Sequence, residues 1–197
     1  MLPHPEALAA PATPTSLTAA VAGQPIDPKT ILATTGPVRA AGSFLLMVVL
    51  GAAVLRLFEA DVDAAIDASL DRPVTSTIYG LIAHGSVGVA TAYAYSFVAS
   101  AGTLAAAGLA VVALAWLIVA AVGFLVTGGV ITGAVGSTQP WTGLVFGAAI
   151  AAAAWLLPSV AAGVAVWFVA VSLGIGGRTR EWVHASRSTS YGGDGRQ

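Results

Sequence analysis

The dominant pattern along the chain is a long uncharged block that divides into apolar segments. Between Arg72 and Arg178 the sequence contains no Asp, Glu, Lys or Arg. This block is several times longer than the roughly 20 apolar residues of one membrane-spanning helix. Another apolar run precedes it. The pattern predicts helical membrane segments at 38–58, 78–100, 103–127, 141–157 and 159–175, with a Gly/Thr/Ser connector at 128–140.

The last two segments are short and meet at Pro158. Each has about 17 residues, which is the lower limit for a membrane span. Proline breaks or kinks a helix when it stands in the interior. We therefore expect a Pro-hinged helical hairpin near the C-terminus, either fully spanning or partly re-entrant. The predicted fold class is all-α, a polytopic integral membrane protein with four to five membrane segments in a helical membrane domain at 38–177.

An acidic stretch at 59–72 separates the first two segments. Carboxylates and apolar side chains each recur there every four residues, at Asp63, Asp67 and Asp71 and at Val62, Ile66 and Leu70. On a helix these positions form two adjacent stripes, which predicts an amphipathic surface helix. A cation site on the carboxylates is the alternative. Calcium loops, however, place ligands at every second residue, with a Gly turn and a terminal Glu, and the sequence lacks that spacing.

The two ends of the chain differ in composition from the membrane segments. Residues 1–37 hold seven prolines among Ala, Thr and Ser, which predicts a disordered tail. Residues 178–197 contain four arginines and predict a cytoplasmic tail that is unstructured beyond Trp182. With five crossings the N-terminal tail lies outside and the acidic stretch inside. With four crossings both termini lie inside and the acidic stretch outside.

Composition narrows the class of protein. The chain is 57% hydrophobic and 9% charged, whereas soluble domains carry about 25% charged residues. These values exclude a soluble enzyme, a nucleic-acid binder and a disordered protein, and they predict a multi-pass protein of the cell membrane. Because there is no cysteine, disulfides, thiolate zinc sites and iron–sulfur clusters are excluded as well.

His84 is the one ionisable residue within the uncharged block, apart from tyrosines. The block offers no acidic residue or second histidine for a proton relay. We expect His84 to lie at the level of the bilayer interface or to face the bundle, bonded to a hydroxyl or a backbone carbonyl. The tyrosines and tryptophans are expected to anchor the helices at the bilayer interfaces, not to line a pigment or quinone pocket. No catalytic residue, cofactor or metal ligand is therefore predicted.

Small residues supply the remaining pattern. Two GxxxG matches, Gly129 with Gly133 and Gly143 with Gly147, are candidates for close helix packing. Such spacing also arises by chance in a chain with 23 glycines. The glycines therefore indicate close packing, for which the segment at 141–157 against a neighbour is the candidate, and do not establish a dimer.

A series of Gly, Pro and Trp landmarks over residues 40–182 resembles a known membrane module. The landmarks are Arg72-Pro73 followed by Ser76 and Gly80, then the stretch from Trp141 to Gly147, Leu157-Pro158, Gly163, and Leu173-Gly-Ile-Gly-Gly177. Their order resembles the membrane part of polymer-forming, bactofilin-like proteins of haloarchaea. Those proteins carry a β-helical polymerising domain ahead of it, where this chain has a Pro/Ala/Thr tail. The resemblance implies an all-helical membrane anchor or scaffold, without filament formation.

These observations favour a non-catalytic structural, scaffold or accessory protein of the membrane. Its expected partners are the lipid bilayer and a second copy or another membrane protein, with no nucleic acid. The alternative is a small transporter or channel component, because broken helices such as the Pro158 hairpin often line substrate paths. A third hypothesis, an intramembrane enzyme, would have to rest on His84 and Ser86.

Overall fold

Five α-helices make up the part of the chain that the computed structural model describes, residues 35–98, 102–137 and 139–191. These residues belong to one compact unit, Thr35–Gln197. The helices are α2 (Gly36–Asp71), α3 (Pro73–Val98), α4 (Gly102–Ala134), α5 (Pro140–Ala154) and α6 (Val160–Tyr191). No strand occurs in the described ranges, and the all-α fold class is confirmed. The tail predicted at 1–37 lies outside the described residues, except for 35–37.

The predicted connector at 128–140 is wrong for its first seven residues, because α4 continues to Ala134. Glycine is a poor helix former on its own, and the sequence suggested a break at Gly128 and Gly129. Both glycines lie in the helix and are buried, Gly128 against α5 and Gly129 against Ile66 of α2. Close packing therefore overrides local preference at this point. The hinge at Pro158 is confirmed, since α5 ends at Ala154 and α6 begins at Val160.

The expectation of an unstructured tail beyond Trp182 is also wrong, because α6 continues to Tyr191. Side chains on either side of Trp182 make contacts within α6, three or four residues apart. Arg178 pairs with Glu181 at 3.5 Å, and Nδ1 of His184 lies 2.8 Å from the carbonyl oxygen of Arg180. Contacts three and four residues apart each add modest stability to a helix. The apolar pattern ends near residue 177, whereas the helix does not.

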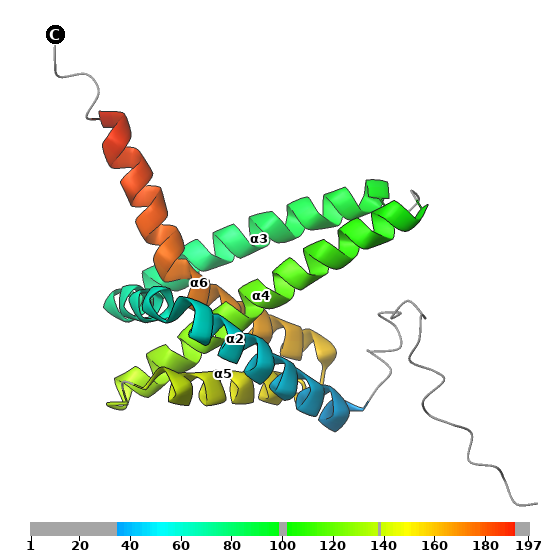
Figure 1. The fold of residues 1–197 in the computed structure, drawn as a ribbon, viewed down its shortest axis with the longest axis horizontal. Helices are drawn as coiled ribbons and strands as arrows, with labels where there is room; N and C mark the ends of the chain where they lie inside the picture. Colours follow the sequence, from blue (N-terminus) through cyan, green and yellow to red (C-terminus); the bar gives the residue numbers. More distant parts are fainter. Residues whose placement is uncertain (1–34, 99–101, 138, 192–197) are drawn as a thin grey trace, which may run out of the picture. The chain divides into compact units, whose positions relative to one another are not determined.

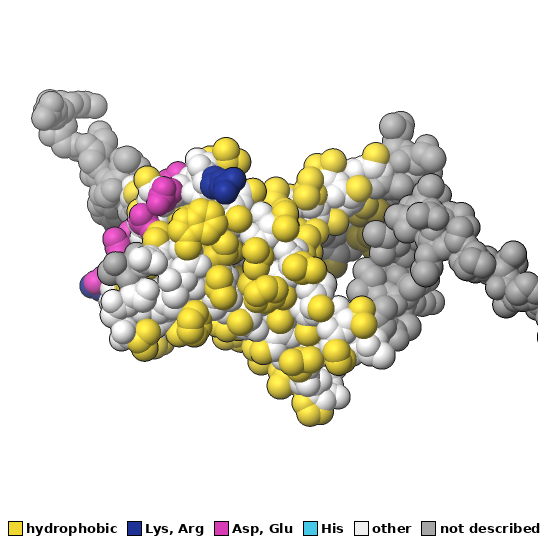
Figure 2. Space-filling view, turned by 60° about the horizontal axis from the view of Figure 1, so that its bottom comes forward, with side chains coloured by type: hydrophobic (Ala, Val, Ile, Leu, Met, Phe, Trp, Pro, Cys, Tyr) yellow, Lys and Arg dark blue, Asp and Glu magenta, His cyan; other side chains and the backbone are white. Residues whose placement is uncertain are grey.

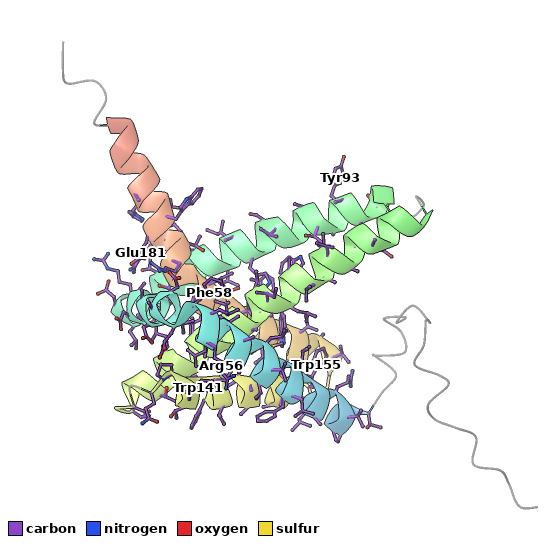
Figure 3. All side chains as sticks on the ribbon, in the orientation of Figure 1. Arg56, Phe58, Tyr93, Trp141, Trp155 and Glu181 are labelled. Atoms are coloured by element: carbon purple, nitrogen blue, oxygen red, sulfur yellow. The ribbon has the colours of Figure 1, made fainter. Side chains whose placement is uncertain are left out.

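Helix α2 is bent at Phe58, whose backbone angles of −139° and 38° are outside the helical region (Figure 3). The bend separates the apolar part of α2, residues 36–57, from residues 59–71, which we call the acidic segment. Val62 and Ala65 of the acidic segment are buried in clusters with Leu125 and Val126 of α4. The acidic segment is therefore helical, as predicted, and covers one end of the helix bundle.

Consecutive helices alternate in direction. In Figure 1, α2, α4 and α6 run toward the left of the view, and α3 and α5 run toward the right. The contacts agree, because Gly128 and Phe124 of α4 meet Gly143 and Gly147 of α5 in reverse order. The end of the bundle with the acidic segment and the α4–α5 turn is called the acidic end below. The opposite end holds the start of α2 and the α5–α6 turn.

The centre of the bundle is filled mainly by small and medium apolar side chains. Phe124 of α4 is 1% exposed and is the largest fully buried side chain of the described residues. Its ring meets Trp167 of α6 edge-on, with centroids 5.3 Å apart. Alanines of α4 and α5, Met47 of α2, and Ala170 and Val171 of α6 belong to the same cluster. Because alanine and glycine are short, the helix axes come close and the backbones carry much of the contact.

Many exposed side chains of the described residues away from the acidic end are large and apolar. Figure 2 shows acidic side chains gathered at one edge of the face in view, whereas apolar side chains cover most of the rest. Among the described residues three helical stretches are long and apolar enough to cross a membrane, Gly36–Asp71, Ala107–Ala134 and Val160–Ala185, and α5 is a shorter apolar helix. The structure is thus that of an all-helical, multi-pass membrane protein.

Candidate functional site

The predicted glycine pairs lie at the contact between α4 and α5. A Cβ atom added to Gly143 would lie 2.8 Å from Cα of Gly129, and one added to Gly147 would overlap the carbonyl oxygen of Phe124. Gly133 lies one turn further along α4, where an added Cβ would come 3.3 Å from Cδ1 of Leu70. All four predicted glycines therefore pack within the chain. Added Cβ atoms at Gly143 and Gly147 would meet α4, whereas those at Gly129 and Gly133 would meet the acidic segment.

A second close contact, between α3 and α6, is not among the sequence-based candidates. An added Cβ at Gly80 would overlap the carbonyl oxygen of Ser172, and one at Gly176 would overlap that of Ser76. All four residues are buried. Ser76 and Gly80 are four residues apart, and so are Ser172 and Gly176. A search for small-x-x-x-small spacing that included serine would have found both pairs, because a buried serine also lets helices approach closely.

His84 lies beside this α3–α6 contact. Its side chain is 3% exposed, and its Nδ1 atom lies 3.4 Å from Oγ of Ser172. The prediction of a bundle-facing histidine bonded to a hydroxyl is confirmed. Ser86, the residue that an intramembrane enzyme would have required beside it, is exposed and makes no hydrogen bond with His84. The structure therefore brings His84 together with Ser172.

The acidic segment and the α4–α5 turn enclose a cleft of about 360 Å³ at the acidic end. Glu59, Asp63 and Asp67 line it on one side, and Thr132 and Gln139 on the other. The hydroxyl of Thr132 donates within α4, to the carbonyl oxygens of Gly128 and Gly129. No group of three or more His, Asp or Glu side chains among the described residues is placed to hold a metal ion.

The third predicted carboxylate, Asp71, points to α6 instead. Its Oδ2 atom lies 3.6 Å from Nη2 of Arg180, which also donates to the carbonyl oxygen of Ala68 at 3.2 Å. Arg180 is 13% exposed and thus satisfies a carbonyl in the last turn of α2, where cations are favoured. Arg178 pairs with Asp61 at 3.0 Å. These contacts fasten the acidic segment to α6.

Two arginine–tryptophan pairs mark the ends of the contact between α2 and α5. Figure 3 labels Arg56 and Trp141 of one pair and Trp155 of the other. The guanidinium carbon of Arg39 lies 5.5 Å from the centre of the Trp155 ring, and that of Arg56 lies 6.0 Å from Trp141. Such distances permit cation–π attraction. The arginines are about 25 Å apart along α2, and the tryptophans about 21 Å along α5. Both residue types favour the interfaces of a bilayer, whose apolar core is about 30 Å thick.

No protein-family model, no curated protein and no solved structure matches the chain. The resemblance to the membrane module of bactofilin-like proteins stays a prediction. The candidate site must therefore be interpreted from its own residues.

Proposed function

We propose that the chain is a non-enzymatic scaffold or accessory protein of the cell membrane, which crosses the bilayer five times. In this arrangement the N-terminal side of α2 faces the exterior, and the acidic end with the C-terminal part of α6 faces the cytoplasm. The acidic end presents a charged platform, Glu59, Asp63 and Asp67, for contact with a cationic surface of another protein or of a second copy.

The observation that carries the proposed arrangement in the membrane is the pairing of Arg178 with Asp61 and of Arg180 with Asp71. Because these pairs join the segment after the first apolar helix to the segment after the last one, both segments lie on one side of a membrane. An arrangement with four crossings and both termini inside would place these two segments on opposite sides of the membrane. Arg56, Arg72, Arg178 and Arg180 then share one side, which supports its cytoplasmic orientation, since cations near helix ends are enriched there.

The charge distribution supports a contact role for the acidic end. Among the described residues no cation pairs with Glu59, Asp63 or Asp67, and all three side chains are exposed. They stand on a segment that is fastened to α6 and buried along its other face. A rigid row of exposed carboxylates attracts a cationic partner as it approaches and fixes how the two surfaces are aligned.

A photo-reactive residue at Ala60, in the exposed face of the acidic segment, tests the proposal in native membranes. We expect a discrete crosslinked product that disappears when Asp63 and Asp67 are replaced by asparagine. The matched control is a photo-reactive residue at Ala149, exposed on α5, which should yield lipid adducts only. Recovery of uncrosslinked monomer alone from the Ala60 variant would refute a scaffold role that uses the acidic end.

A transporter or channel component remains the second candidate, supported by the cleft of about 360 Å³ at the acidic end. Carboxylates, a hydroxyl and an amide line it, a chemistry that attracts hydrated cations. Cation flux through proteoliposomes that contain the purified protein would support this candidate. Cation flux no faster than that of protein-free vesicles would exclude a channel made of this chain alone.

A further inference from the structure

His84 is the one ionisable side chain among the buried polar residues of the described ranges, and half of its hydrogen-bonding capacity is unused. Nδ1 faces Ser172 on α6. The described residues supply no hydrogen-bond partner for Nε2. Nε2 is also not one of the fully buried unpaired atoms, so part of its surface is accessible. An ionisable group at membrane depth costs free energy and commonly marks a functional site. The unpaired Nε2 atom of His84 is therefore a candidate for binding a ligand.

Aromatic rings hold the imidazole in place. Phe168 of α6 stacks on it with centroids 4.2 Å apart and an interplanar angle of 14°. The Trp116 ring of α4 lies 4.7 Å from it at 34°. The indole Nε1–H of Trp116 donates to Oγ1 of Thr91 at 3.2 Å, so its single polar group is already paired. Trp116 thus takes part in a side-chain cluster between helices, whereas the sequence predicted an interface anchor.

A cleft between α3 and α4 opens beside these rings. Its volume is about 250 Å³, and its apolar lining includes Val87, Val112 and Ala115, together with His84 and Trp116. An engineered apolar cavity of about 150 Å³ binds benzene, and pockets for larger molecules begin at about 300 Å³. The space therefore suits one substituted ring. Because no charged residue lines the cleft, the occupant must be neutral.

We propose that this cleft binds a flat, neutral ring with a carbonyl oxygen, the head-group chemistry of a lipid-soluble quinone, and that Nε2 of His84 donates a hydrogen bond to that oxygen. The ring packs against Trp116, since aromatic surfaces favour flat partners. Its apolar tail leaves between α3 and α4 past Val112 and Val119, which are each 39% exposed. This proposal concerns binding and is independent of the scaffold role.

Ser172 sets the direction of the hydrogen bond. In a neutral imidazole one nitrogen donates and the other accepts. When the hydroxyl of Ser172 donates to Nδ1, the ring proton stays on Nε2, which can then donate to a carbonyl but cannot accept from a donor. Ser172 is a positioning residue in this arrangement, whereas His84 touches the ligand.

Decylubiquinone is a suitable probe for the intact protein in lipid nanodiscs, with saturable binding measured by equilibrium partitioning. We expect Ala115→Leu, which fills the cleft, to abolish saturable binding. Ala113→Leu makes the same change on an exposed position of α4 that does not line the cleft, and should leave binding unchanged. His84→Phe keeps a stacking ring but removes Nε2, and should weaken binding about fivefold to tenfold.

A second probe separates the hydrogen bond from simple partitioning into lipid. Decylbenzene has a ring and the same tail but no oxygen, so the His84→Phe change should not alter its binding. Absence of saturable decylubiquinone binding, or equal binding by the Ala115→Leu and Ala113→Leu proteins, would overturn the proposal. Equal affinity of the natural and His84→Phe proteins for decylubiquinone would overturn the role of His84. Matched elution volumes and helical content show that the variants are folded.

Discussion

Nη2 of Arg178 lies 3.0 Å from Oδ1 of Asp61, although the two residues are 117 positions apart in the chain. Asp61 follows the first apolar helix, and Arg178 follows the apolar part of the last. The contact therefore places both sites at the acidic end. The proposed arrangement with five crossings requires this placement, and the alternating helix directions agree with it (Figure 1).

The first prediction concerns this arrangement in cells. Single cysteines at Thr35, Ala60 and Ala185 all replace exposed residues in a chain that has no cysteine of its own. A membrane-impermeant thiol reagent added to intact cells should label Thr35→Cys and leave the other two unlabelled. Ala60 and Ala185 lie at the acidic end, which faces the cytoplasm in the proposed arrangement. All three should react after the membrane is opened. Labelling of Ala60→Cys but not Ala185→Cys in intact cells would be incompatible with the Arg178–Asp61 pair.

The second prediction concerns the contact between α4 and α5. Replacing Gly147 by alanine should destabilise the protein by about 1–3 kcal/mol, because the new methyl group overlaps the carbonyl oxygen of Phe124 and the helices must move apart. Gly42→Ala is the matched control. Nothing lies within 4 Å of its added methyl group, so the better helix propensity of alanine should stabilise α2 by up to about 1 kcal/mol.

Thermal or denaturant unfolding in detergent measures both variants. A lower midpoint for Gly147→Ala and an equal or higher one for Gly42→Ala is the expected result. Equal effects of the two substitutions would show that the helices do not meet at Gly147.

The sequence was sufficient for the fold class because the apolar pattern has a strong physical cause. A bilayer requires about 20 apolar residues for each crossing, and that requirement appears directly in composition. The hinge at Pro158 could be predicted for a similar reason, since proline restricts its own backbone and removes a donor. The bend at Phe58 was close to the predicted boundary at 58–59, where the pattern changes from apolar to acidic.

The candidate site depended on tertiary contacts and was less predictable. Spacing marked Gly143 and Gly147 as packing residues without indicating whether the partner was α4 or another chain. Thr91 and Trp116 are 25 residues apart, and neither the hydrogen bond between them nor the placement of His84 beside Phe168 follows from a local pattern. Helix packing brings these groups together.

The third prediction compares the two arginines that fasten the acidic segment to α6. Arg180→Ala should lower the unfolding free energy by about 1–2 kcal/mol, because Arg180 is 13% exposed and its loss leaves the carbonyl of Ala68 without this donor. Arg178→Ala should cost less than about 1 kcal/mol, since Arg178 is 47% exposed and water screens its pair with Asp61.

Raising the salt concentration supplies an independent check on these arginines. The effect of Arg178→Ala should shrink with salt, whereas that of Arg180→Ala should persist because its hydrogen bond to the backbone is partly buried. A larger loss for Arg178→Ala than for Arg180→Ala would contradict the burial seen at these two positions.

The last prediction concerns the arginine–tryptophan pairs at the ends of the α2–α5 contact. Nε and Nη1 of Arg39 are buried without a hydrogen-bond partner among the described residues, so its attraction to Trp155 acts with little competition from water. A double-mutant cycle with Arg39→Met and Trp155→Leu should give a coupling energy of about 1–2 kcal/mol. The corresponding cycle with Arg56→Met and Trp141→Leu should give less than about 1 kcal/mol, because Arg56 is exposed and lies 6.0 Å from the ring. Coupling energies in the reverse order would show that contact with lipid, and not burial within the bundle, decides the strength of each pair.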